Sequence, residues 1–192
     1  MSFILSGLFS MNENASLMLA RSEKNGSLWL GNSDAIIDSD FLIRNDIKVI
    51  INCTHQMPFI YETSRDTQGI SELETIRLPV YDSLLDKDIY LMENYYHDIL
   101  PFTLKKLLKE KKNIIINCRA GRQRSASVVA LVLFVMIQNE LIENSELPRV
   151  ENKQVLMRSV IKYILKKRPQ AFSFGLRVNF KKSLENFLGF TF

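Results

Sequence analysis

The chain has 192 residues, of which 46% are hydrophobic and 24% are charged, and its formal net charge is +4. It contains no run of about eighteen uncharged apolar residues, which excludes a predicted membrane-spanning helix, and its two cysteines are too few for a secreted disulfide framework. We therefore expect a protein of a reducing compartment, the cytoplasm or alternatively the nucleus, without stable membrane insertion. The sequence does not predict an oligomeric state.

Residues 1–25 have no clear periodicity, and we expect a loosely structured N-terminal extension there. The rest of the chain, residues 26–192, has no repeats, low-complexity tracts or linkers and is predicted to form one folded domain. Lysine clusters at residues 105–112 and basic residues at 166–168 are either solvated helix faces or surfaces that favour anionic partners.

Three strands are predicted in the first half of the domain. Residues 27–31 form a short strand that a glycine ends, and residues 47–53 form a buried strand rich in β-branched side chains. Residues 75–80 alternate in strand fashion, although Pro79 indicates a strand end or an edge. Asp82 should therefore lie in the loop that follows.

The second half alternates helices with one strand. Residues 90–111 have apolar side chains at helical spacing, with Pro101 as a point of kinking or division. The β-branched run at residues 113–116 predicts a central strand, and residues 125–138 leave almost no polar face, so this helix should be buried. The alternation predicts an α/β fold with a central, mostly parallel sheet flanked by helices. Two more helices are expected, at residues 151–167 and 178–188.

A phosphate-binding loop is predicted between the buried strand and the buried helix. A tight loop that leads into a helix directs several backbone N–H groups and the helix dipole at one point. Gly121 allows the backbone to approach a ligand, and Arg124, six residues after Cys118, can bind two phosphate oxygens. The same field would lower the pKa of Cys118, and only its thiolate attacks phosphorus efficiently.

In this region the sequence resembles the cysteine-dependent protein tyrosine phosphatases, whose signature is Cys, five residues, Arg and then Ser or Thr. Here it spans Cys118 to Ser125, and the loop at residues 118–124 is called the signature loop below. The chain is closest to the dual-specificity branch, because it reproduces that branch's LWLGN and VIINCT strands, its V-x-D segment at residues 80–82 and its Arg-Pro pair at residues 168–169. The resemblance implies a protein-tyrosine-phosphatase-like fold and a catalytic domain at residues 26–192.

The resemblance also assigns roles to single residues. Cys118 would be the nucleophile, Arg124 the phosphate clamp and Asp82 the general acid that protonates the leaving oxygen, while Ser125 would assist departure of the thiolate. An acid is needed because an alkoxide or phenolate leaving group is basic. Asp86 and Asp88 lie near Asp82 and are alternative candidates for that role. Substrate phosphate would be bound by the loop residues Arg119, Ala120, Gly121, Arg122, Gln123 and Arg124.

Asn117 is a departure from the family, which usually has a histidine at this position. The histidine orients the loop and helps to tune the cysteine, so Asn117 leaves open a weakly active, phosphate-binding pseudophosphatase, although an asparagine can still donate a hydrogen bond. The Pro-Asn pair that usually follows the Arg-Pro pair is also missing, and residues 172–176 take its place.

Arg119 and Arg122 add two cations to the signature loop. Extra guanidinium groups suit extra phosphate charge, so a phosphoinositide or an RNA 5′-triphosphate end is an alternative substrate; the other reading is that both point to solvent or stabilise the loop.

Cys53 is either a small buried core residue or, as in some relatives, a redox partner of Cys118. The two histidines, His55 and His97, have no metal-ligand spacing, and we expect neither a metal nor another cofactor. The sequence thus predicts a phosphatase that hydrolyses phosphomonoesters through a phosphocysteine intermediate, with dual specificity for phosphotyrosine and phosphoserine/threonine proteins.

Overall fold

The computed structural model describes residues 14–63, 72–83, 85–172 and 179–192. The first thirteen residues of the expected N-terminal extension lie outside the described residues, as do position 178 and most of the segment that replaces the Pro-Asn pair.

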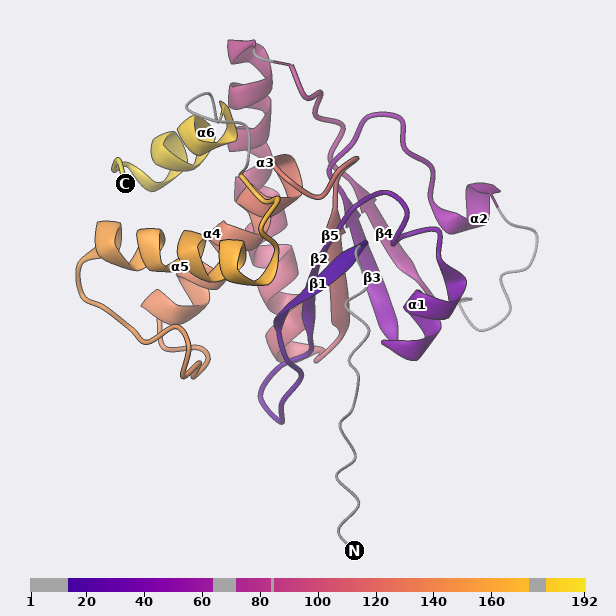
Figure 1. Ribbon diagram of the computed structural model, residues 1–192, viewed down its shortest axis with the longest axis horizontal. Helices are drawn as coiled ribbons and strands as arrows, with labels where there is room; N and C mark the ends of the chain where they lie inside the picture. The colour runs from indigo at the N-terminus through magenta and orange to yellow at the C-terminus, as the bar shows by residue number, and fades with distance from the viewer. Residues whose placement is uncertain (1–13, 64–71, 84, 173–178) are drawn as a thin grey trace, which may run out of the picture.

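A five-stranded sheet forms the centre of the domain (Figure 1). Its strand order is β1-β2-β5-β3-β4, and only the β1–β2 pair is antiparallel. The mostly parallel α/β sheet predicted from the sequence is therefore confirmed. The strands are β1 (Ala15–Leu19), β2 (Leu28–Gly31), β3 (Ile47–Asn52), β4 (Glu74–Arg77) and β5 (Asn113–Asn117).

Helices cover both faces of this sheet. In Figure 1, α1 (Ser39–Arg44) and α2 (Ile60–Thr63) lie on the right of the sheet, and the other helices lie on the left. The left-hand helices are α3 (Asp86–Leu104), the π-helical turn η1 (Lys105–Lys109), α4 (Arg124–Gln138), α5 (Lys153–Lys167) and α6 (Asn179–Leu188).

The central strand β5 is covered on both faces, as its β-branched composition predicted. Ile114 and Ile116 pack into the core under α3 to α6, whereas Ile115 packs into the smaller core under α1. All three are fully buried. This alternation follows from the period of two in a strand.

Helix α4 lies in the middle of the larger core. Every residue of it except Val135 and Gln138 is buried, which confirms the prediction drawn from its missing polar face. A helix that is apolar all round has to be enclosed by protein, and α4 is enclosed by the sheet and by its neighbours α3, α5 and α6.

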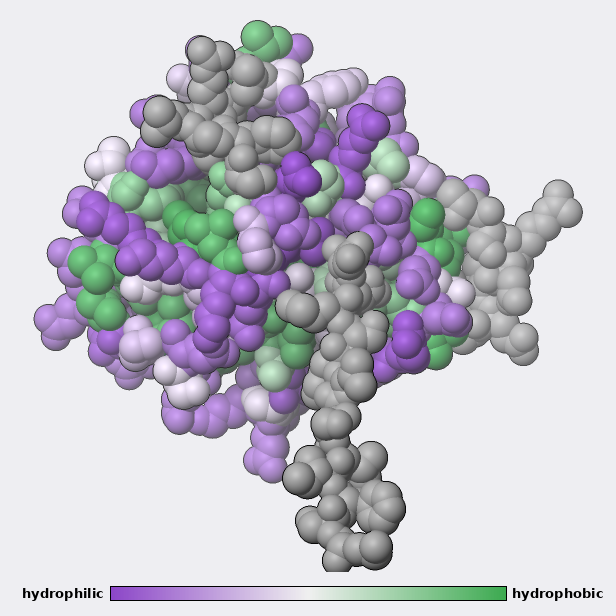
Figure 2. All heavy atoms as spheres, viewed as in Figure 1, coloured by the Kyte–Doolittle hydropathy of each residue, from purple (hydrophilic) through white to green (hydrophobic). Residues whose placement is uncertain are grey.

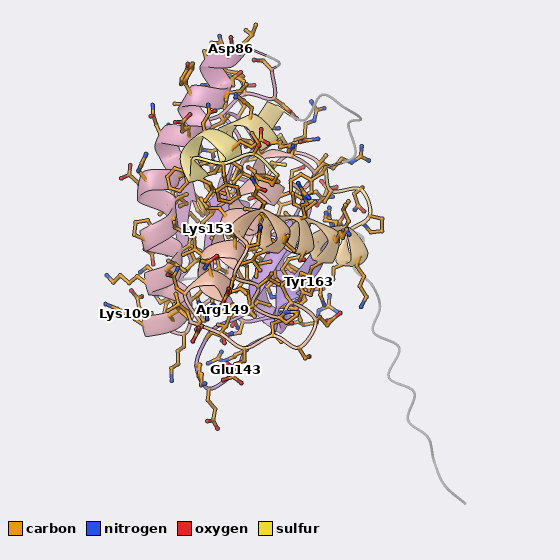
Figure 3. All side chains as sticks on the ribbon, turned by 90° about the vertical axis from the view of Figure 1, so that its left-hand side faces the viewer. Asp86, Lys109, Glu143, Arg149, Lys153 and Tyr163 are labelled. Carbon is orange, nitrogen blue, oxygen red and sulfur yellow. The ribbon has the colours of Figure 1, made fainter. Side chains whose placement is uncertain are left out.

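Helix α3 and η1 form one column from Asp86 to Lys109 (Figure 3). Pro101 lies inside this helix, so the structure excludes the division that was one of two alternatives at this residue. The backbone changes to π-helical winding four residues later, at Lys105.

Two expectations about these segments are wrong. The segment before residue 26 is not loosely structured throughout, because Ala15–Leu19 pairs with β2 as an edge strand. Lys106 is not part of a solvated face: it is 8% exposed, and its Nζ lies 2.7 Å from Glu74 and 3.0 Å from Glu110. Both errors arise because a partner in another strand decides the outcome: β2 for residues 15–19 and Glu74 of β4 for Lys106. Within the described parts of the chain, no helix combines the length and the apolar character needed to cross a membrane.

Candidate active site

The signature loop lies at the carboxyl end of β5, between this strand and the first turn of α4 (Figure 1). Ligands of parallel α/β sheets commonly bind outside the carboxyl ends of the strands. β3 pairs with β5 in register, with Asn52 opposite Asn117, so the loop after β3 begins beside the signature loop.

Gly121 has a left-handed backbone conformation, with φ of 63°. A Cβ at this position would lie 2.6 Å from the carbonyl oxygen of Gly31 and 2.7 Å from Nη2 of Arg168. Such distances are not tolerated, so glycine is required here by the close approach of β2 as well as by the positive φ. From the sequence, we expected Gly121 only to let the backbone approach a ligand.

Cys118 lies at the base of the loop and is 2% exposed. Ser125 Oγ donates a hydrogen bond to its Sγ over 3.2 Å. Burial alone would raise the pKa of the Cys118 thiol, but the Arg124 guanidinium opposes this. The Ser125 hydroxyl and the backbone N–H groups of Ser125 and Arg122 act in the same sense, and the pKa falls below its usual value. These surroundings favour the nucleophilic thiolate.

Arg124 is 5% exposed and is held from the opposite side of the site. Its Nη1 donates to the Val80 carbonyl oxygen over 2.8 Å, and its Nη2 lies 3.3 Å from Oδ2 of Asp82. Its Nε has no hydrogen-bond partner among the described residues. Because a buried donor without a partner is costly, Nε is a position at which an oxyanion would be stabilised.

Asp82 lies at the edge of an open pocket of about 410 Å³, and its side chain is 53% exposed. The stacked rings of His55 and Tyr81, with centroids 4.5 Å apart, form another part of the wall. The lining residues are Thr54, His55, Gln56, Met57, Val80, Tyr81, Asp82, Arg119 and Arg124.

The two additional arginines of the loop differ in position. Arg119 is exposed and lines the pocket. Arg122 is partly buried and does not line the pocket, and its carbonyl oxygen accepts a hydrogen bond from the Phe172 N–H over 2.9 Å. Of the remaining predicted binding residues, Ala120 is exposed, whereas Gln123 is 5% exposed and its side-chain amide has no partner among the described residues.

Asn117 is fully buried at the end of β5. Its backbone oxygen accepts from the Cys53 N–H over 2.7 Å, but within the described structure neither its Nδ2 nor its Oδ1 has a hydrogen-bond partner. We expected that the asparagine could still donate a hydrogen bond in place of the usual histidine. Its Nδ2 donates none to any described group.

Arg168 supports the back of the signature loop, a role that the sequence did not reveal. It is 2% exposed, and it donates from Nε to the Gly121 oxygen over 2.9 Å and from Nη2 to the Ala120 oxygen over 3.3 Å. In the sequence, the Arg-Pro pair at residues 168–169 was only one of the features that resemble the dual-specificity branch. The sequence does contain a hint of this contact. Arg168 continues the spacing of the buried residues Val160 and Ile164 of α5, so a basic residue falls at a position that should face the core.

The alternative acids are less well placed than Asp82. Asp88 is 2% exposed and accepts a hydrogen bond from the Ser83 hydroxyl, so its carboxylate is committed to the start of α3. Asp86 lies exposed in the first turn of α3. Neither lines the pocket that contains Arg124.

Cys53 follows β3 beside Cys118 and is fully buried. Burial raises the pKa of its thiol well above the usual value, and the nearby Cys118 raises it further. Within the described residues, no group of three or more histidine, cysteine, aspartate or glutamate side chains is arranged to hold a metal ion.

The family model described as the dual specificity phosphatase catalytic domain matches residues 28–187. The chain belongs to this family. The match covers β2 to α6 and includes the signature loop, which confirms the resemblance to the dual-specificity branch of the cysteine-dependent protein tyrosine phosphatases. No match was found among curated proteins.

Solved structures of dual-specificity and related phosphatases share the fold. The Yvh1 phosphatase domain from Chaetomium thermophilum has a TM-score of 0.63 at 12% identity, covering 91% of this chain and 95% of its own. Human DUSP28 has a TM-score of 0.54 at 17% identity, covering 83% and 86%. The human tyrosine phosphatase-like serine/threonine/tyrosine-interacting protein has a TM-score of 0.54 at 15% identity, covering 84% and 91%.

Proposed function

We propose that this member of the family is an active phosphatase that hydrolyses phosphomonoesters through a phosphocysteine intermediate. In the first step the Cys118 thiolate attacks phosphorus, an S–P bond forms and the P–O bond to the leaving group breaks. The protonated Asp82 carboxyl gives its proton to the departing oxygen, so that an alcohol or phenol is released. Arg124 and the loop N–H groups bind the phosphoryl oxygens throughout.

In the second step water attacks the phosphocysteine. The Asp82 carboxylate, now deprotonated, accepts a proton from the water, an O–P bond forms and the S–P bond breaks. The electron pair returns to Cys118 as a thiolate, which the Ser125 hydroxyl stabilises by its hydrogen bond, and inorganic phosphate is released. The thiolate regained in this way is the species that starts the next turnover.

The observation that carries this proposal is the combination of groups around the Cys118 thiol. Its pKa is lowered despite complete burial, and the buried Nε of Arg124 has no partner in the described structure. A lowered thiol pKa beside an unpartnered guanidinium nitrogen suits a site that binds an oxyanion and attacks it.

We propose phosphotyrosine and phosphoserine/threonine proteins as the substrates. The chain belongs to the dual specificity phosphatase family, and the open pocket beside Arg124 suits a side chain presented from a protein surface. A second candidate is a more highly charged phosphate, such as a phosphoinositide or an RNA 5′-triphosphate end. Exposed Arg119 favours it, because this additional cation lines the same pocket.

Turnover of an aryl phosphate by wild type, Cys118→Ser and Arg124→Ala tests the proposal. Both variants should be inactive. Cys118→Ser should still bind orthovanadate, while Arg124→Ala should bind it about tenfold more weakly or worse, since each hydrogen bond to a charged group contributes about 1.5–3 kcal/mol. Cys53→Ala, which changes the chain's only other cysteine, is the matched control and should remain active.

The same preparations distinguish the alternatives. Faster hydrolysis of a phosphopeptide than of an inositol phosphate or a triphosphate RNA supports protein substrates, and the reverse order supports the highly charged ones. A wild-type protein that binds vanadate without turnover would contradict the proposal and support a phosphate-binding pseudophosphatase.

A further inference from the structure

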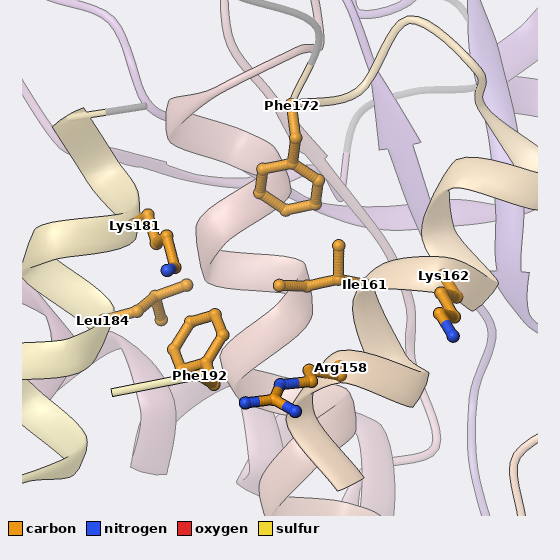
Figure 4. Close-up of a pocket in the computed structure, with 7 residues that line it drawn as sticks. All are labelled: Arg158, Ile161, Lys162, Phe172, Lys181, Leu184 and Phe192. Carbon is orange, nitrogen blue, oxygen red and sulfur yellow. The ribbon is translucent and has the colours of Figure 1, made fainter. Parts of the chain in front are cut away.

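A second pocket, of about 310 Å³, lies between α5 and α6 (Figure 4). Its lining is separate from that of the candidate active site, since the two pockets share no residue. The volume is at the lower end of the range of about 300–1,000 Å³ that small-molecule sites occupy. The lining residues are Arg158, Ile161, Lys162, Phe172, Lys181, Leu184 and Phe192.

The interior of this pocket is apolar. In Figure 4 the side chains of Ile161, Phe172, Leu184 and Phe192 converge on its centre. Leu184 is fully buried and belongs to the main core, so the floor is a fixed part of the domain. The face in Figure 2 also shows hydrophobic side chains exposed among hydrophilic ones over the region of α5 and α6. An apolar chain or ring would therefore be stabilised in the pocket by transfer from water.

The charged side chains that line the pocket are all cations. Arg158 and Lys162 are exposed, lie one turn apart on α5, and have no ion-pair partner in the described parts of the chain. Lys181 is already paired with Glu185 at 3.1 Å and lies over the Phe192 ring, 5.1 Å from its centroid. In Figure 4 the guanidinium of Arg158 lies beside Phe192, whereas Lys162 points away from the centre. The charge at the mouth thus comes chiefly from Arg158.

We propose that this pocket binds a small amphiphilic carboxylate, with its apolar chain among the four hydrophobic side chains and its carboxylate at Arg158. A guanidinium binds a carboxylate with paired hydrogen bonds. One unpaired guanidinium at the mouth of an apolar pocket suits a single carboxylate, whereas a polyanion would leave most of its charges without partners. The positive edge disfavours an amphiphilic cation.

Phe172 connects this pocket to the signature loop. Its ring lines the pocket, and its backbone N–H donates to the Arg122 carbonyl oxygen over 2.9 Å. Its φ is 55°, which is unusual for a residue with a side chain. A ligand that displaces the Phe172 backbone together with its ring would change the geometry of this hydrogen bond. Occupancy should therefore alter oxyanion affinity at the loop, and this consequence rests on the proposed function.

Titration of the full chain with octanoate, followed by calorimetry and by NMR of the isoleucine and leucine methyl groups, tests the binding site. Octanoate should bind at least tenfold more tightly than octylammonium, which has a similar chain and the opposite charge, and should shift the methyl signals of Ile161 and Leu184. Arg158→Gln/Lys162→Gln should weaken octanoate binding about tenfold. The control Lys153→Gln/Lys182→Gln removes two exposed cations from α5 and α6 that do not line the pocket, and should leave the affinity unchanged.

Equal affinities for octanoate and octylammonium, absence of octanoate binding, or equal losses in the two double variants would overturn the proposal. These measurements do not depend on turnover, so an inactive protein that binds octanoate would contradict the proposed function and leave the pocket assignment in place. The connection through Phe172 is tested by titrating orthovanadate with and without saturating octanoate. A change of about threefold or more in vanadate affinity is expected, and an unchanged affinity would refute the connection alone.

Discussion

At the scale of single residues, Asn117 stands where the resemblance to the family leads us to expect a histidine. Its carboxamide is buried directly behind Cys118 without a hydrogen-bond partner in the described structure. An unsatisfied buried polar group costs about 1–3 kcal/mol. The lowered pKa of Cys118 therefore depends on Arg124, Ser125 and the loop amides rather than on Asn117.

We predict that Asn117→His lowers the pKa of Cys118 further. A protonated imidazole behind the loop would add a positive charge near the thiolate, and one pKa unit corresponds to about 1.4 kcal/mol of such stabilisation. The acidic limb of the pH–rate profile should move to lower pH, with an unchanged circular dichroism spectrum. A shift of this limb to higher pH would show that the histidine acts differently here.

Asp82 and a bound phosphate compete for the same guanidinium. The Asp82 carboxylate lies 3.3 Å from Nη2 of Arg124, so an arriving dianion would repel and displace it. We predict that Asp82→Asn binds orthovanadate more tightly than wild type, yet hydrolyses a phosphotyrosine peptide about 10²- to 10⁴-fold more slowly, as expected for loss of a general acid.

The loss in Asp82→Asn should be much smaller for an ester of a low-pKa phenol, because that leaving group needs no proton. Asp86→Asn is the matched control and should behave like wild type on both substrates. If Asp86→Asn instead shows the dependence on the leaving group, Asp86 and not Asp82 is the general acid, while the roles proposed for Cys118 and Arg124 would stand.

The two cysteines are predicted to differ in alkylation by iodoacetate. The pKa of Cys118 is lowered and that of Cys53 is raised, so at any given pH Cys118 should carry more thiolate than Cys53. The alkylation rate of Cys118 should rise with its lowered pKa as the midpoint, and Arg124→Ala should move this midpoint to higher pH. Peptide mass spectrometry checks which residue is modified, and labelling of Cys53 first would contradict this account.

At the scale of elements, the signature loop is fixed from two sides. The β5–loop–α4 unit directs its amides at the site, and Arg168, at the end of α5, binds the carbonyl oxygens of Ala120 and Gly121 from behind. Burial lowers the pKa of Arg168, and the neighbouring Cys118 opposes this decrease. Arg168 is thus a positioning residue that acts on the site through the loop.

We predict that Arg168→Met lowers the melting temperature and raises the pKa of Cys118. Two hydrogen bonds to a charged group contribute about 3 kcal/mol or more, which corresponds to roughly 6–12 °C at 2–4 °C per kcal/mol for a domain of this size. Arg168→Lys keeps the charge but cannot hold both carbonyl groups, so it should restore the pKa more than the melting temperature. An unchanged alkylation profile in Arg168→Met would reduce Arg168 to a purely structural role.

At the scale of the whole molecule, the sequence predicted local units better than long-range contacts. The strand at 113–116, the apolar helix and the loop between them were correct because periodicity and motif lie within one short segment. The edge strand β1, the buried Lys106 and the support from Arg168 were missed, because each depends on a partner outside its own segment: β2, Glu74 and the signature loop. The lack of a hydrogen-bond partner for the Asn117 side chain among the described residues could not be predicted either, because it depends on which groups surround the end of β5 in the folded chain.

The sheet, with helices on both faces, places Cys118, Arg124 and Ser125 at the carboxyl end of its central strand β5. Asp82 comes from the loop after β4.

The central claim is that these groups form a covalent phosphocysteine. The direct measurement is acid quenching during turnover of a phosphotyrosine peptide, followed by peptide mass spectrometry. We predict one phosphoryl group on the peptide that contains Cys118, absent in Cys118→Ser; turnover that continues in Cys118→Ser, or label on any other residue, would contradict the account.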